Sequence, residues 1–280
     1  MRVSSVFMPF FALMAGAAGF YLRLMELWNV FDEHTGLPER GAGITYALIA
    51  FSIAFLLIVL VFSARATVKH VAPNGFENAF GTDPLTYPVV FSAIGLVWLG
   101  ATVRYYLDLD STLPLPAIEL IFLIMSALSA ISIAFFAIEM YQDPRSKSKY
   151  ALSIAPSLFM CFWLVILYRQ NASNPVLLSY CYHCLAVLAS ALGFYFTSGF
   201  VYNKPATGKA IFSYFASIYF CFVTLADEHT FAVRLLIAAL ISVSVMHASM
   251  LIRNLKWKEE EEEEGEKGEK GEGEEKEEEV

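Results

Sequence analysis

Long apolar runs alternate with short polar connectors along most of the chain. Each run is close to the roughly twenty residues that an α-helix needs to cross a bilayer. The connectors hold most of the charged residues and many of the Gly and Pro residues that favour turns. The predicted spans cover residues 3–22, 43–62, 87–107, 117–141, 151–168, 176–202, 210–226 and 231–252. The pattern predicts an all-α, polytopic transmembrane helical bundle of about eight spans.

Composition supports a protein embedded in a membrane. Hydrophobic residues make up 57% of the 280 residues, and charged residues only 16%, whereas soluble domains carry about 25% charged residues. The connectors are also too short to hold a soluble catalytic domain. We therefore expect a multi-pass protein of the cell membrane, surrounded by lipid and without a nucleic-acid partner.

The negative charge of the chain belongs to its last residues. The formal net charge is -8, but residues 259–280 alone contain fourteen Glu and three Lys, a local balance of -11, which leaves +3 on residues 1–258. A segment of this composition has no apolar surface to bury, and its like charges repel at helical spacing. The sequence predicts a helical domain over residues 1–257 and a disordered, Glu-rich cytoplasmic tail over residues 258–280.

Orientation follows from the basic residues, because loops that cross the membrane are depleted in Lys and Arg. Alternate connectors contain eleven Lys and Arg on one side and four on the other. Both termini are therefore predicted to be cytoplasmic. The first run also resembles a secretory signal, but we expect it to be retained, because apolar residues continue as far as Phe31. Its removal would leave seven spans in the same orientation.

Small residues in the first span recur four positions apart. Ala12 and Gly16 form one such pair, and Ala15 and Gly19 form another. This spacing lets the backbone of a second helix approach closely. A neighbouring helix is therefore expected against this face.

A tetrapeptide that occurs twice marks the first candidate site. Asp32-Glu33-His34-Thr35 lies in the first long polar connector, and Asp227-Glu228-His229-Thr230 lies between the last two spans. Both copies are predicted on the extracytoplasmic side. Carboxylates and imidazoles can bind a divalent cation or relay protons, although Asp, Glu and Thr also favour helix starts for purely structural reasons. The candidate binding residues are Asp32, His34, Asp227 and His229.

Ionisable side chains inside the spans mark a second set of candidates. Such groups are costly in hydrocarbon and usually face the bundle interior or a cavity. We single out Glu119 and Arg234 as candidate binding residues. Glu119 is expected to form an ion pair with Arg234 or with Arg104, which would join helices; the alternative is a substrate or ion pathway.

Motifs of known enzyme classes are missing from the sequence. It contains no phosphate-binding glycine loop, no H-E-x-x-H and no G-x-S-x-G. Cys181 and Cys184 form a C-x-x-C, but no second such pair is present to complete a metal site. We predict no catalytic residue, no metal site and no cofactor, and expect that the protein is not an enzyme.

The phrase Phe31 to Pro38, F-D-E-H-T-G-L-P, fits the pattern F-D-x-x-T-G-L-P. In this connector and its flanking helices the chain resembles a group of uncharacterised bacterial polytopic membrane proteins. The resemblance implies a multi-pass architecture and no particular activity.

Two functional classes remain open. The first is a non-catalytic membrane partner or sensor subunit, with a protein partner or a second copy of the chain; the alternative is a small-molecule or ion-coupled transporter.

Overall fold

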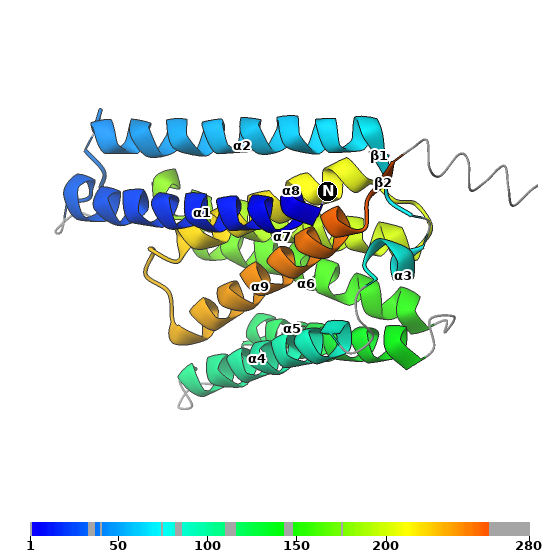
Figure 1. Cartoon of the computed structure of the whole chain (residues 1–280). Coiled ribbons are helices and arrows are strands. Elements are labelled where there is room, and N and C mark those ends of the chain that lie inside the picture. The colour runs from blue at the N-terminus through cyan, green and yellow to red at the C-terminus, as the bar shows by residue number, and fades with distance from the viewer. Residues whose placement is uncertain are drawn as a thin grey trace, which may run out of the picture.

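The fold is a bundle of long helices that run back and forth, as Figure 1 shows. The computed structural model describes residues 2–32, 37–39, 41–73, 75–81, 86–109, 116–142, 148–174 and 176–257. Within this part of the chain the long helices are α1 (Arg2–Val30), α2 (Gly43–Lys69), α4 (Thr86–Asp108), α5 (Ala117–Gln142), α6 (Ser148–Asn171), α7 (Cys181–Val201), α8 (Thr207–Thr224) and α9 (Phe231–Arg253). The all-α, multi-pass architecture predicted from the sequence is confirmed.

Four short elements complete the described structure. They are α3 (Phe76–Ala79), the 3-10 helix η1 (Leu177–Ser179) and the two-residue strands β1 (His70–Val71) and β2 (Lys256–Trp257). The strands pair antiparallel and join the end of α2 to the end of α9. The β1–β2 pair and the first turn of α1 lie at the same end of the bundle (Figure 1). The predicted acidic tail, residues 258–280, lies outside the described residues.

Helix α1 continues eight residues beyond the predicted end of the first span. The prediction ended the span at residue 22, where polar side chains begin, but the helix ends at Val30. Arg23 and Glu26 lie on this extension, are completely buried, and form an ion pair three residues apart on the helix. Because they satisfy each other inside the bundle, their charge does not end the helix.

Helix α8 differs from the other long helices. Within the described residues, seven helices are long and apolar enough to cross a membrane, and α8 is not among them. It packs against α1, α2, α7 and α9, and every residue in it except Lys209 is at least partly buried. Its Ser217 hydroxyl bonds those of Ser190 on α7, at 2.8 Å, and Ser244 on α9, at 3.0 Å. Since protein rather than lipid surrounds it, α8 does not need the apolar composition expected of an eighth lipid-exposed span.

The small residues of α1 lie against α8, as the sequence predicted. A Cβ atom added to Gly16 would lie 2.9 Å from Phe222, and one added to Gly19 would lie 2.7 Å from Val223. Both distances are shorter than ordinary contacts between carbon atoms. The two glycines therefore fix how closely α1 approaches the central helix.

Candidate functional site

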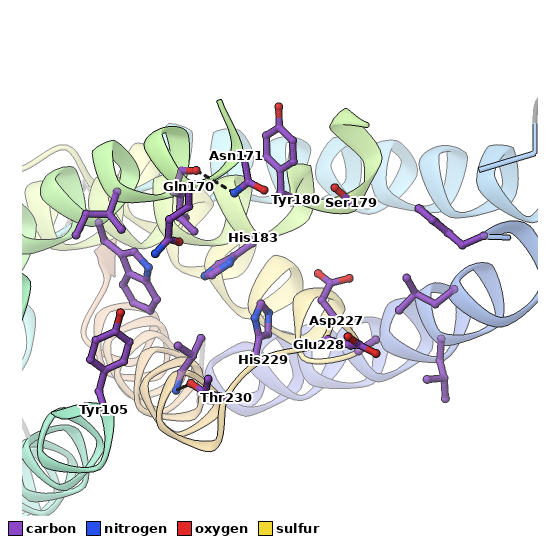
Figure 2. A pocket seen from close by; sticks show the side chains of 18 of the residues that line it. Tyr105, Gln170, Asn171, Ser179, Tyr180, His183, Asp227, Glu228, His229 and Thr230 are labelled. Carbon is purple, nitrogen blue, oxygen red and sulfur yellow. Dashed lines mark hydrogen bonds between the residues drawn. The ribbon is translucent and has the colours of Figure 1, made fainter. Parts of the chain in front are cut away.

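A large pocket opens at the end of the bundle opposite the β1–β2 pair. It has a volume of about 810 Å³ and is formed by α1, α4, α5, α6, η1, α7, the connection between α8 and α9, and the first turn of α9. Figure 2 shows its labelled polar side chains. It is lined by Leu24, Leu27, Trp28, Phe31, Asp32, Tyr105, Phe122, Trp163, Ile166, Leu167, Gln170, Asn171, Ser179, Tyr180, His183, Ala226, Asp227, Glu228, His229, Thr230 and Val233.

Arg23 lies buried behind the pocket and joins three parts of the chain. Its Nη1 donates to Glu26 Oε2 at 2.7 Å, and its Nε donates to Asp227 Oδ1 at 2.8 Å. Nη2 donates to the Leu178 carbonyl at 2.9 Å. The planar guanidinium, with donors in several directions, suits such a junction. It connects α1 to η1 and to the α8–α9 connection, and so holds two walls of the pocket in place.

The charges around Arg23 do not cancel. Glu26 and Asp227 contribute two carboxylates against one guanidinium, so the group has a net charge of -1 when both acids are ionised. Glu26 Oε1 is buried and has no hydrogen-bond partner among the described residues. Buried charges are tolerated only when they are well paired. The walls of the pocket therefore depend on Arg23 for their stability.

A second chain of hydrogen bonds runs from Asp227 to His229 through Thr224. The Thr224 hydroxyl donates to Asp227 Oδ2 at 2.9 Å, and its oxygen lies 3.1 Å from His229 Nε2. A hydroxyl has one proton and a carboxylate only accepts, so this network assigns the proton of the neutral His229 ring to Nε2, which donates to Thr224. The Nδ1 atom of His229 is then the acceptor of that ring.

His183 on α7 lies next to His229 at the pocket, as Figure 2 shows. The two rings are 4.6 Å apart between centroids, and the Trp163 ring packs against His183 in a T-shaped arrangement with 5.5 Å between centroids. His183 is only 8% exposed, and its Nε2 has no hydrogen-bond partner among the described residues. A buried polar atom without a partner is unusual in folded proteins. Gln170 from α6 points toward the same region (Figure 2).

The pKa of His229 is lowered from its ordinary value of about 6.5, chiefly because burial penalises the charged ring. The positive charge of Arg234 lowers it further, while Asp227 and a contact with the Thr224 backbone raise it. At neutral pH the ring is therefore neutral, in agreement with the hydrogen-bond assignment.

Acidification is expected to destabilise the protein through His229. The unfolded chain binds a proton on this ring below pH 6.5, while the folded chain does not until the pH reaches the lower folded pKa, so stability falls as the pH drops through that window. Between pH 7.5 and pH 5.5 the loss from this ring is up to about 1.4 kcal/mol. Unfolding by SDS in mixed micelles at the two pH values should show a smaller loss in His229→Gln than in wild type. Equal losses of stability in His229→Gln and wild type would contradict a lowered pKa for His229.

The sequence-predicted candidates lie mostly at this end of the bundle. Asp32, Asp227 and His229 line the pocket, so the two copies of the tetrapeptide approach the same cavity. His34 of the first copy lies outside the described residues. Glu119 accepts a hydrogen bond of 2.9 Å from the hydroxyl of Tyr105, which is itself a lining residue.

The ion pair expected for Glu119 is not formed. Arg104 instead pairs with Asp108, one turn further along α4, at 2.8 Å. Arg234 is exposed on α9 and has no ion pair within the described part of the chain. The i,i+4 geometry on a single helix brings Arg104 and Asp108 together without any tertiary constraint, whereas a partner on another helix depends on packing that the sequence does not reveal.

The metal site considered for the repeated tetrapeptide is not formed by the described residues. Among them, no three His, Cys, Asp or Glu side chains lie close enough to hold a metal ion. In the second copy, Asp227 is hydrogen-bonded to Arg23 and His229 is hydrogen-bonded to Thr224. Glu228 remains exposed. Successive side chains point in different directions, which prevents one copy from supplying a set of ligands.

Sequence reasoning missed the buried group that organises the site. Arg23 and Glu26 were assigned to a polar connector, although their spacing of three residues in a run with helical character is typical of an ion pair on a helix. That spacing was the one sequence signal for the buried ion pair. The sequence held no signal for the role of Thr224, because a single Thr at the end of an apolar run is common.

Comparison of the chain with protein-family models, with curated proteins and with solved structures finds no match. The site is therefore interpreted from its own geometry.

Proposed function

We propose that this multi-pass membrane protein is a non-catalytic receptor, a sensor or partner subunit that takes a small molecule into the pocket between α1, α6, α7 and α9. The observation that carries the proposal is the pocket itself. Its volume of about 810 Å³ lies within the range of about 300–1,000 Å³ typical of small-molecule sites. Its lining combines aromatic and aliphatic side chains with a few convergent polar groups, which is also typical of such sites.

The rigidity of the pocket walls supports a binding role. Arg23 and Thr224 hold Asp227 through both of its carboxylate oxygens, and Arg23 also holds the carbonyl of Leu178 in η1. The walls are thus positioned before a ligand arrives, which lowers the entropy cost of binding.

The order of the hydrogen bonds supports a non-catalytic reading. Asp227, His229 and Thr224 have the side chains of a nucleophile triad, but in such a triad the acid orients the imidazole, and the imidazole accepts the hydroxyl proton. Here Asp227 accepts the hydroxyl proton directly and His229 donates. Thr224 is also completely buried, so its oxygen has no access to a substrate.

Filling the pocket is expected to abolish ligand binding. Gln170 is exposed on α6 and points into the pocket (Figure 2), so Gln170→Trp adds bulk where a ligand would lie without disturbing a buried contact. We expect that a thermal-shift screen of the purified protein against neutral, anionic and cationic metabolites identifies compounds that raise Tm. The same compounds should leave the Tm of Gln170→Trp unchanged.

Tyr168→Trp provides the matched control, since Tyr168 is 75% exposed on the same helix and does not line the pocket. This variant should respond to compounds as wild type does. A screen in which no compound stabilises wild type, or in which Gln170→Trp responds fully, would refute the proposal.

A row of buried polar groups along α8 favours a carrier as the second candidate. Below Thr224, Ser217 bonds Ser190, and Tyr214 bonds Thr197 at 2.7 Å. The ring of His247 on α9 lies 5.6 Å from that of Tyr214. Ionisable and polar groups inside a membrane bundle often line transport pathways. Proteoliposomes loaded with a stabilising compound distinguish the two functions, because a receptor retains the compound and a carrier releases it.

A further inference from the structure

The described wall of the pocket is acidic. Three carboxylates line it, from Asp32, Asp227 and Glu228, and its described lining contains no Lys or Arg. Arg23 approaches Asp227 from behind the wall, but it also pairs with Glu26. Glu228 is exposed and has no ion pair with another described residue. The pocket therefore favours positive charge in a ligand.

Aromatic rings cover the same space. The lining includes Trp28, Phe31, Tyr105, Phe122, Trp163 and Tyr180. The faces of such rings attract cations, and Trp does so most strongly. The chain already uses this interaction here, since the guanidinium carbon of Arg23 lies 5.7 Å from the ring centroid of Phe31. Trp28 is 71% exposed, four residues before Asp32, so a large ring and a carboxylate border the pocket together.

The pocket offers hydrogen-bond acceptors to a ligand, alongside donors such as the Gln170 amide. The carboxylates accept only, and the neutral His229 ring has Nδ1 as its acceptor. His183 Nε2 is buried without a partner, and the Asn171 amide nitrogen is already engaged by the Leu167 carbonyl at 2.9 Å. A ligand that carries N–H donors matches this arrangement.

We propose that the pocket binds a small organic cation, an ammonium group on an apolar body. Glu228 attracts the charge, and the aromatic rings cover the apolar body. The inference rests on the ligand-binding function proposed above. A bare metal ion does not fit, because the described residues offer no group of three metal ligands and the cavity far exceeds the size of such an ion.

Matched pairs of cation and neutral analogue test the charge requirement. Choline is compared with 3,3-dimethylbutan-1-ol, in which carbon replaces the charged nitrogen, and phenethylamine with 2-phenylethanol. Tryptophan fluorescence of the purified full chain in nanodiscs reports binding, since Trp28 and Trp163 line the pocket. We expect at least one cation to bind at least tenfold more tightly than its neutral partner. Glu228→Gln should weaken that cation about tenfold.

Glu39→Gln is the control, because Glu39 is exposed near the same end of the bundle but does not line the pocket. It should leave the affinity for the cation unchanged. Equal affinity for cation and neutral analogue, or no binding of either cation, overturns the inference. If neutral or anionic compounds still stabilise wild type and not Gln170→Trp, the ligand-binding function stands without it. If no compound of any charge binds, both proposals fail.

Discussion

Replacement of Arg23 by Met is expected to lower the free energy of unfolding by about 3–5 kcal/mol. Arg23 is completely buried and is the ion-pair partner of both Glu26 and Asp227. Met retains most of the apolar volume but leaves two buried carboxylates without a counter-charge, and it removes the donor that holds the Leu178 carbonyl. In this variant α1, η1 and the α8–α9 connection lose the side chain that joins them.

Unfolding by SDS in mixed micelles measures this loss. Arg104→Met is the matched control, because Arg104 forms an ion pair with Asp108 on a single helix and its side chain is 51% exposed. Exposed pairs contribute about 0–1 kcal/mol. Adding Glu26→Gln and Asp227→Asn to Arg23→Met should restore part of the stability, since the uncompensated charges are then removed. A loss no larger than that of the control would show that the buried group is not the anchor of the site.

Hydropathy predicted most of the fold, because the length of a membrane-crossing helix is set by the bilayer. The starts and ends of the helices mostly agree with the apolar runs. The prediction failed at α1, where Arg23 and Glu26 continue the helix into the interior. It also predicted a span over residues 210–226, where α8 lies, without showing that this helix is central. Its lower apolar content reflects its central position, where protein surrounds it.

The candidate site was predicted in part. Asp32 and Asp227, one from each copy of the tetrapeptide, line one cavity, since two connectors on the same side of a bundle lie near each other. The interaction of Asp227 with Arg23 was not predictable, because 204 residues separate them and their pairing depends on how α1 packs against the α8–α9 connection. Glu119 likewise accepts a hydrogen bond from Tyr105 and does not pair with the expected arginine. Local spacing predicts neighbours on one helix, whereas contacts between helices require the packing itself.

Replacement of Gly19 by Leu is expected to separate α1 from α8 at a cost of about 3 kcal/mol. A Cβ atom at this position would lie 2.7 Å from Val223 Cγ2 and 3.0 Å from Tyr219 Cε2. Tyr219 has little freedom to move, because its hydroxyl bonds Ser52 at 2.8 Å and its ring stacks on Phe55 at 4.6 Å. The helices must therefore move apart, and Arg23, one turn beyond Gly19, moves with α1.

Since the Cβ atom itself is too close, Gly19→Ala should already lower the stability measured in SDS, and Gly19→Leu should lower it further. Gly100→Leu is the control, because Gly100 is exposed on α4 and a Cβ there meets nothing within 4 Å; its effect should remain within about 0.5 kcal/mol. Because Leu is a better helix former than Gly, helix propensity predicts no loss at either position, and equal losses at the two positions would contradict contact with α8 as the cause. A loss confined to Gly19 means that contact with α8 sets the position of α1, and through Arg23 the position of the pocket wall.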